Sequence, residues 1–444
     1  MNHLPIPNKL ITIDQKTLDQ VAAGNAEYVA EKGRRGKRAN LAFHDLSSMD
    51  LCGRDLSYAD LSGANLTDTA LYKVKLSCSV LSSAIFRLAH LDGADLSQAD
   101  MRGCSLYGAK LTQANLRGAD LGEGPRLRIS ESGDITFRAD SIEPTELVAA
   151  NLVQADMSGA IISHGQIMQA NLSDVTLRKA ILAGASFRGT VLDGADLGNA
   201  DLSGADLSDT SMQGAILEGA KLSGASLNGA DMLGAIIDRR AIGAGSGVKN
   251  LPERTKPAPG SFSAMLTAHE LWITSYGRDG SRLELLNADL SDVVFAELDL
   301  SGARLINCDL SRANLTRCKL RLVDMSLSNL QDAILLEADM RAAVMKRSFC
   351  RQANFSGVTF ASVETGVNSE KRISANLQKS HFQQAEFSTC NFTDADLTGC
   401  NLEGANMANV ILEGASLTNA KVTAGTFDQI EAAGGNLDGI RIHT

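Results

Sequence analysis

Residues 195–209 read ADLGN-ADLSG-ADLSD, three copies of one five-residue unit in direct succession. In each copy, a small residue and an acidic residue precede a leucine: Leu197, Leu202 or Leu207. A period of five fits neither an α-helix, with about 3.6 residues per turn, nor a flat strand, with about two. The unit therefore predicts a coil with short sides, in which the leucine and the small residue point inward.

The same unit extends in both directions over most of the chain. We call its large apolar residue the centre. Centres recur every five residues in four blocks, at 41–121, 147–237, 285–360 and 377–427, and fade through Leu437 and Ile442. The second block starts one residue out of phase with the first. Short repeats of fixed period are typical of solenoids, in which each coil pairs with its neighbours.

These residues resemble the pentapeptide-repeat family, whose pattern is A-(D/N)-L-x-x. Ala59-Asp60-Leu61 and Ala114-Asn115-Leu116 are typical copies. The resemblance covers residues 39–121, 147–242, 285–360 and 375–442. It implies an all-β solenoid, namely a right-handed quadrilateral β-helix with about 20 residues per coil.

The chain also repeats on a larger scale, which indicates two tandem halves. Three residues before the first block recur at one constant offset before the third: Gly33, Gly36 and Arg38 correspond to Gly277, Gly280 and Arg282. We therefore expect a cap helix and a Gly-x-x-Gly-x-Arg turn at 1–38, a first β-helix at 39–242 interrupted by an insertion at 122–146, a Gly/Pro-rich linker at 243–260, a second cap helix at 261–284, and a second β-helix at 285–444 interrupted at 361–374.

Each half needs a cap, because an open coil end exposes apolar centres and unpaired backbone groups. Apolar residues at helical spacing before both halves predict the two cap helices, and Ser261 or Ser263 is the expected N-cap of the second. The first insertion follows Leu121 and the second follows Phe360, so we expect the insertions at matching positions.

The first insertion is predicted to be a hairpin, because apolar and polar residues alternate on both sides of Gly133. Its candidate functional residues are Arg126, Arg128, Phe137 and Arg138. Loops that leave a solenoid often carry function. A tolerated surface insertion is the alternative.

Charge gives a second candidate site. The net charge is −10, which argues against a general nucleic-acid binder. The region near residues 193–238 is acidic, with Lys221 its single lysine. The candidate partner-binding acids are Asp193, Asp196, Asp201, Asp206, Asp209, Glu218 and Asp231. They form either an ordinary solvated surface or an acidic ladder for a basic partner.

The sequence offers no catalytic, cofactor-binding or metal-binding constellation, so we do not expect an enzyme. Most of its 8 cysteines occupy inward positions, which predicts core packing and a reducing, cytoplasmic setting. The 7 histidines are scattered, without ligand spacing. No apolar run approaches the length of a membrane span.

Two functional hypotheses follow. The favoured one is a non-enzymatic scaffold or protein-interaction module, with an unknown protein partner and no direct contact to nucleic acid. The alternative comes from the resemblance, because some members of the family mimic duplex DNA and bind DNA gyrase; gyrase or another DNA-binding protein would then be the partner. The C-terminal end, with Ile430, Ile440 and Ile442, is either a homodimer interface or a frayed last coil.

Overall fold

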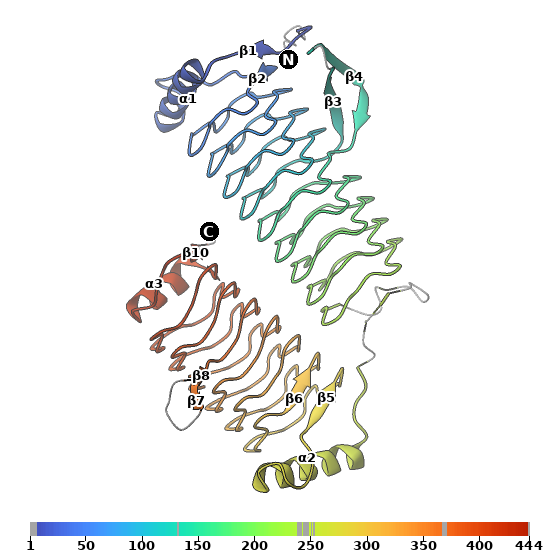
Figure 1. The fold of residues 1–444 in the computed structure, drawn as a ribbon, viewed down its shortest axis with the longest axis vertical. Coiled ribbons are helices and arrows are strands. Elements are labelled where there is room, and N and C mark those ends of the chain that lie inside the picture. Colours follow the sequence, from blue (N-terminus) through green and yellow to red (C-terminus); the bar gives the residue numbers. More distant parts are fainter. Residues whose placement is uncertain are drawn as a thin grey trace. The chain divides into compact units, whose positions relative to one another are not determined.

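The computed structural model describes residues 7–130, 133–237, 242, 248–249, 251, 254–365 and 371–442, with the backbone alone for 137–140, 365 and 371. The chain forms two compact units, Met1–Leu251 and Pro252–Thr444, and each is described by itself (Figure 1).

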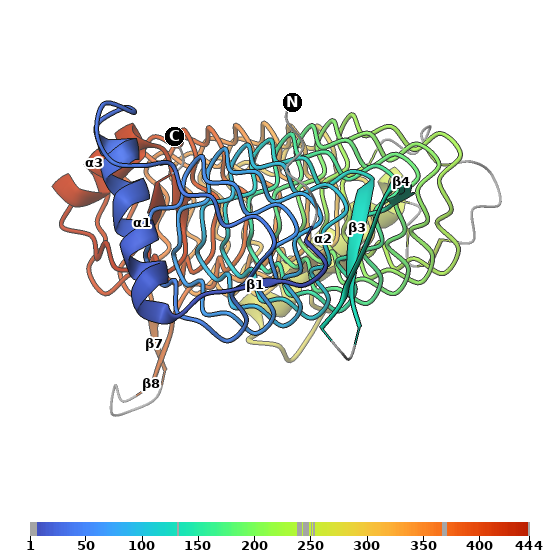
Figure 2. The same ribbon diagram turned by 90° about the horizontal axis from the view of Figure 1, so that it is seen from above.

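Both units are β-solenoids. Parallel bridges join residues twenty positions apart, as in the series from Asn40 through Asp60 to Val80. Since one repeat has five residues, four repeats complete one coil and the coil has four faces. Figure 2 shows these coils stacked behind one another. The centres from Leu41 to Leu121 and from Leu147 to Met232 are buried, as the repeat predicts.

The hydrogen bonds explain the acidic or amide residue before each centre. The side chain of Asp60 accepts a bond from the backbone N–H of Ser62 at 3.0 Å, and the same bond recurs along the solenoid. An Asp or Asn that bonds two residues ahead stabilises a tight turn. The turn then needs a left-handed residue, which is Gly63 (φ 63°) in this repeat and Tyr58 (φ 64°) in the one before.

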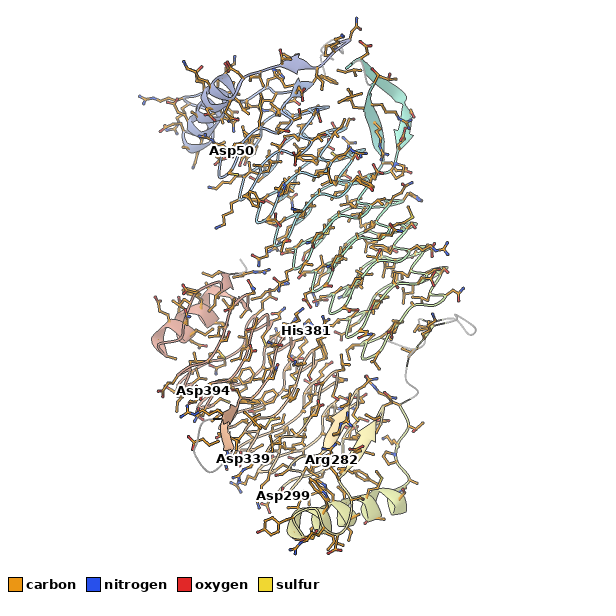
Figure 3. All side chains as sticks on the ribbon, in the orientation of Figure 1. Asp50, Arg282, Asp299, Asp339, His381 and Asp394 are labelled. Carbon is orange, nitrogen blue, oxygen red and sulfur yellow. The ribbon has the colours of Figure 1, made fainter. Side chains whose placement is uncertain are left out.

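Unit 1 begins with β1 (Ile11–Thr12), α1 (Gln15–Ala30) and β2 (His44–Asp45), where β1 pairs in parallel with β2. Helix α1 lies against the first coil and buries Leu18 and Ala22 there. The side-chain amide of Gln15 bonds the backbone of Asp50, which Figure 3 labels beside the helix. Apolar and polar contacts therefore both fix α1 to the coil.

The first insertion is a hairpin, as expected. Strands β3 (Gly124–Ile129) and β4 (Ile135–Glu143) pair antiparallel, with an irregularity between Pro125 and Leu127. The coil resumes in register after it, because Ser105 bridges Glu146 and Asp120 bridges Ile161. The parallel bridges between successive coils therefore continue without interruption on both sides of the insertion.

Unit 2 starts with α2 (Pro259–Thr274), followed by β5 (Glu284–Leu286) and β6 (Arg304–Ile306), which pair in parallel. Helix α2 begins earlier than predicted. Its N-cap is Ala258, which makes no side-chain cap bond, so the expected Ser261 or Ser263 cap is wrong. Pro259 occupies the first turn, where a missing N–H costs no helical hydrogen bond.

The second insertion also forms a hairpin, from β7 (Val363–Thr365) and β8 (Lys371–Ile373). The match in position predicted between the two insertions is wrong by one repeat. If Leu41 corresponds to Leu285, then Phe360 corresponds to Leu116 and not to Leu121. One repeat is one face, so the two hairpins leave their coils at adjacent corners.

The regular repeats of unit 2 end sooner than predicted. After β9 (Lys421–Val422), the chain forms α3 (Ala424–Ala432), and β10 (Arg441–Ile442) then pairs in parallel with β9. Phe427 therefore lies in a helix, and Ile430 is buried in the core. The last coil is covered by α3 rather than frayed, and nothing in this arrangement supports a homodimer.

The turns after α1 and α2 make equivalent contacts. Lys37 N–H bonds the Gly24 carbonyl at 2.9 Å, and Ser281 N–H bonds the Ala268 carbonyl at 3.1 Å. A Cβ on Gly36 would lie 2.4 Å from the Gly24 oxygen, and a Cβ on Gly280 would lie 2.2 Å from the Ala268 oxygen. Both turns therefore require glycine for the same reason.

Candidate functional site: the groove beneath the β3–β4 hairpin

The β3–β4 hairpin is seated closely on unit 1. A Cβ on Gly103 would lie 2.5 Å from the Pro125 oxygen, and one on Gly124 would lie 2.8 Å from the Arg102 carbonyl carbon, so both glycines permit the approach. At the end of the hairpin, the buried Thr145 hydroxyl accepts the Gly103 N–H at 3.1 Å and bonds the Gly122 carbonyl at 3.0 Å.

The tip of the hairpin is tied to the N-terminal segment. Lys9 forms an antiparallel bridge with Asp134, and the N–H of Ile135 bonds the Asn8 carbonyl at 2.9 Å. Gly133 (φ 79°) supplies the left-handed residue of the turn. The hairpin is therefore held at both ends and lies along the outside of the coils (Figure 2).

A groove of about 790 Å³ separates the hairpin from the solenoid. Its floor is one face of unit 1, at the centres Leu46, Leu66, Phe86, Leu106 and Leu147; we call this face, which continues through Ile167 and Phe187, the hairpin face. The groove is lined by Ser47, Ser48, Asn65, Thr67, Ile85, Arg87, Ser105 and Glu146 from the hairpin face, and by Arg126, Leu127, Arg128 and Ile129 from β3.

Three arginines dominate the charge of the groove. Arg126 lies 3.4 Å from the Glu143 carboxylate and 3.8 Å from that of Glu146, and its guanidinium also bonds the Pro144 carbonyl. Arg128 is 69% exposed and pairs with Glu143 at 2.9 Å. Arg87 is exposed and lies over the ring of Tyr107, 4.9 Å from its centroid. Among the described residues, Arg87 pairs with no carboxylate.

The structure brings together part of the predicted insertion site. Arg126 and Arg128 both line the groove. Phe137 and Arg138 lie in β4, but their side chains fall outside the described atoms. Arg87 and the hydroxyl-rich floor were not predicted from the sequence. A period of twenty residues, applied to the sequence, would have identified them, because residues 47, 67, 87 and 107 then lie on one face.

The predicted acidic residues do not form one ladder. Asp196, Asp201 and Asp206 lie on three successive faces of one coil, because they are five residues apart. Their neighbours along the solenoid are not acidic: Asp196 bridges Thr176 and Ile216, Asp201 bridges Ile181 and Lys221, and Asp206 bridges Ser186 and Ser226.

These carboxylates are also engaged within the chain. Asp196 is only 5% exposed and pairs with Arg178 at 3.0 Å. Hydrogen bonds from Ser203 lower the pKa of Asp201, and those from Ser208 lower the pKa of Asp206. The remaining candidates have partners too: Asp193 accepts from Ser211 and Gln213, Asp209 lies 3.5 Å from Arg188, Asp231 accepts from Gln213, and Glu218 is engaged as well.

A smaller cleft of about 470 Å³ lies at the β7–β8 hairpin of unit 2. Arg341 and Arg372 line it, and each is already paired: Arg341 with Asp339 at 2.7 Å, and Arg372 with Asp394 at 3.2 Å. Figure 3 labels both aspartates near this hairpin. Both arginines of this cleft are therefore neutralised by aspartates, and the volume of the cleft is smaller than that of the groove in unit 1.

The cysteines that the repeat places at inward positions are buried. Burial raises the pKa of Cys308 and Cys318 to about 11 and that of Cys390 and Cys400 to about 12. Cys52 and Cys78 are exposed. Across the described ranges, no group of three His, Cys, Asp or Glu side chains is arranged to hold a metal ion. No helix in the described part of the chain is long and apolar enough to span a membrane.

Coils of four five-residue sides, each with an inward leucine and an Asx-stabilised turn, define a repeat-built β-solenoid. A family model described as "Pentapeptide repeats (8 copies)" matches residues 37–77, 84–122, 145–174, 170–209, 205–239, 288–326, 324–360, 373–407 and 390–428. These ranges cover more than half of the chain, which therefore belongs to the pentapeptide-repeat family. This membership implies the right-handed β-helix that the resemblance predicted.

Several solved structures are similar to this chain. HetL from Nostoc sp. strain PCC 7120, a pentapeptide repeat protein involved in heterocyst differentiation regulation, is 22% identical over 73% of this chain and 88% of its own, with a TM-score of 0.22. Rfr23 from Cyanothece 51142 is 31% identical over 29% and 91%, with a TM-score of 0.23. QnrB1, a plasmid-mediated fluoroquinolone resistance protein, is 22% identical over 44% and 84%, with a TM-score of 0.24. No curated protein matches the chain.

Proposed function

We propose that this protein is a non-enzymatic, cytoplasmic interaction scaffold that docks a partner protein at the β3–β4 hairpin. The observation that carries the proposal is the groove: a hairpin fixed at both ends leaves about 790 Å³ of space lined by arginines and hydroxyl groups. The coils supply rigidity, and a rigid scaffold that positions a protruding loop is a common way to build a binding site.

We also propose that α1 and α2 act as caps and that the two units arose by tandem duplication.

Deletion of residues 124–144 tests the proposal. Without them, Leu121 and Leu147 are again five residues apart, and Thr145 takes an inward position like that of the buried Thr69. The solenoid should therefore keep its far-UV circular dichroism. Affinity capture from lysate of the native organism, read by mass spectrometry, should lose the partner.

The second unit provides the matched control. Deletion of residues 363–374 removes the β7–β8 hairpin and restores the five-residue spacing between Phe360 and Leu377. This variant should retain the partner. If the variant that lacks residues 124–144 captures the same partner as the wild type, the hairpin is not the docking element.

A second candidate function is mimicry of DNA toward gyrase or another DNA-binding protein. It is supported by the net charge of −10 and by the family to which the chain belongs. Replacing Asp201 and Asp206 by Asn removes two part-exposed charges but keeps an acceptor for each turn, and Asp196 is left in place because it is buried against Arg178. This variant should abolish any effect of the protein on DNA supercoiling by gyrase. If the wild type has no effect at low salt, the mimic hypothesis fails.

A further inference from the structure

We infer that the groove beneath the β3–β4 hairpin binds an extended, acidic segment of a partner protein. This inference rests on the proposed scaffold function and specifies the chemistry of its partner. It is drawn from the charge of the lining, the direction of the hydroxyl groups and the side chains at the groove's outer edge.

The charge of the lining favours an anion. Three guanidinium groups line the groove, whereas two carboxylates, Glu143 and Glu146, pair with Arg126 and Arg128, in a chain whose net charge is −10. Arg126 is committed to Glu143 and Glu146, so it holds the wall in place. Arg87 is exposed and pairs with no carboxylate among the described residues, so it is the main donor; Arg128 is exposed but already bonds Glu143 through one nitrogen, so it offers only its remaining N–H groups. A guanidinium binds a carboxylate through two parallel hydrogen bonds, which suits an Asp or Glu side chain.

The floor favours a polypeptide over a polyphosphate. Ser47 donates its hydroxyl proton to Asp45, Thr67 to Asn65 and Ser105 to Glu146, each at 2.7 Å. These hydroxyl oxygens therefore present lone pairs to the groove, and a peptide backbone supplies N–H groups to match them. A nucleic-acid backbone has no N–H donors to match these lone pairs.

The outer edge adds side chains of the kind that contribute most at interfaces. Tyr107, beneath Arg87, is 37% exposed. Tyrosine and arginine are enriched among interface hot spots. Ile85 and Ile129 give the groove an apolar strip, so the segment should carry an apolar residue near its acidic one.

Selection of short random peptides displayed on phage, against the immobilised full chain, tests the inference. Selected peptides should be rich in Asp and Glu with an interspersed apolar residue. Their affinity, measured by fluorescence anisotropy of a labelled synthetic copy, should fall by about tenfold or more in Arg87→Glu and further with Arg128→Glu. Arg188→Glu is the matched control, because Arg188 lies on the hairpin face but outside the lining, and it should bind normally.

Four results would overturn the inference. The first three are that no peptide is selected, that the selected peptides lack acidic residues, or that they bind Arg87→Glu and Arg188→Glu equally well. Displacement by a single-stranded oligothymidine as effective as by the acidic peptide would also overturn it, because the site would then accept any polyanion. Peptides that bind independently of Arg87 would leave the scaffold function standing. That function fails separately if deletion of residues 124–144 leaves partner capture unchanged.

Discussion

At the residue scale, the five-residue repeat is explained by what each position must do. The centre and the small residue fill a narrow core, and the Asp or Asn accepts a backbone N–H at the turn, as Asp60 does from Ser62. The corner residue must be left-handed, which glycine tolerates at no steric cost. Many corners nevertheless carry other residues, such as Tyr58, Leu88 and Thr389, so the solenoid holds them in a conformation that they rarely adopt.

Two glycines with similar backbone angles should differ widely in tolerance. A Cβ on Gly204 (φ 68°) would meet nothing within 4 Å, so Gly204→Ala should cost only about 1 kcal/mol for the left-handed conformation. A Cβ on Gly36 (φ 73°) would lie 2.3 Å from the Tyr28 nitrogen, and this backbone cannot move aside. Gly36→Ala should therefore cost about 3 kcal/mol or more.

Urea unfolding followed by far-UV circular dichroism measures both variants. Each free energy of unfolding is compared with that of the wild type under identical conditions. Equal destabilisation would mean that the turn after α1 can rearrange, and that the contact of Gly36 with the helix does not fix α1.

At the element scale, the two helices attach to their coils through equivalent but chemically different residues. In α1, the Asn25 side chain accepts the Ala39 N–H at 2.8 Å and donates to the carbonyls of Asp55 and Ser57. In α2, the corresponding His269 accepts the Leu283 N–H on Nδ1 at 3.0 Å, which requires a neutral ring. Its buried Nε2 bonds no described atom. Asparagine does not titrate in the physiological range, whereas histidine does.

The attachment of α2 should therefore weaken in acid. Burial lowers the pKa of His269, opposed by Asp299 and aided by Arg282. A histidine whose folded pKa is depressed stabilises the fold above its unfolded pKa, near 6.5, and loses this contribution as pH falls below it. The wild type should lose stability between about pH 7 and pH 5, and His269→Asn should lose less.

The fluorescence of Trp272, the single tryptophan, measures this effect because its ring stacks on His269 at 5.6 Å between centroids. Urea midpoints are recorded at each pH for both proteins, and Asn25→Ala in unit 1 serves as the control that should leave the pH dependence unchanged. Parallel pH profiles for wild type and His269→Asn would contradict the prediction.

The sequence predicted the elements that follow from the spacing of apolar residues along the chain. It did not predict the features that depend on how successive coils stack on one another. The centres, both N-terminal helices and the first hairpin followed from periodicity and from Gly133. Helix α3 was missed because Phe427 falls on the five-residue spacing by coincidence. Residues twenty positions apart lie next to each other on one face. This relation decides at which corner each insertion leaves its coil, and which residues line the groove together with Arg126 and Arg128. A period of five does not reveal that relation until the number of sides per coil is known.

At the scale of the whole molecule, the chain has two separate hydrophobic cores. The first includes residues from Leu18 to Ala235, and the second includes residues from Leu283 to Ile430. In solenoids, each repeat contacts mainly its neighbours, so stability is close to a sum of local terms. We therefore expect Met1–Leu251 and Pro252–Thr444 to fold as separate proteins.

Expression of the two fragments tests this expectation. Each should show the circular dichroism of a β-solenoid and unfold in urea near the midpoint of the same unit in the full chain. Trp272 reports unit 2 in both contexts, since unit 1 has no tryptophan. A fragment that is unfolded alone, or whose midpoint falls sharply, would mean that one unit depends on the other.

The register on the two sides of the β3–β4 hairpin has a consequence for how such a protein acquires new partners. Ser105 bridges Glu146 across the insertion much as Ser186 bridges Asp206 where no insertion exists. A corner can thus host an added segment, and the longer β3–β4 and shorter β7–β8 hairpins show that its length can differ, provided that the chain re-enters at the next inward position. Recognition and folding are then under separate selection: the grafted segment can diverge or be exchanged while the coils stay the same. For a designer, the two corners that already carry β3–β4 and β7–β8 are the places to install a binding loop.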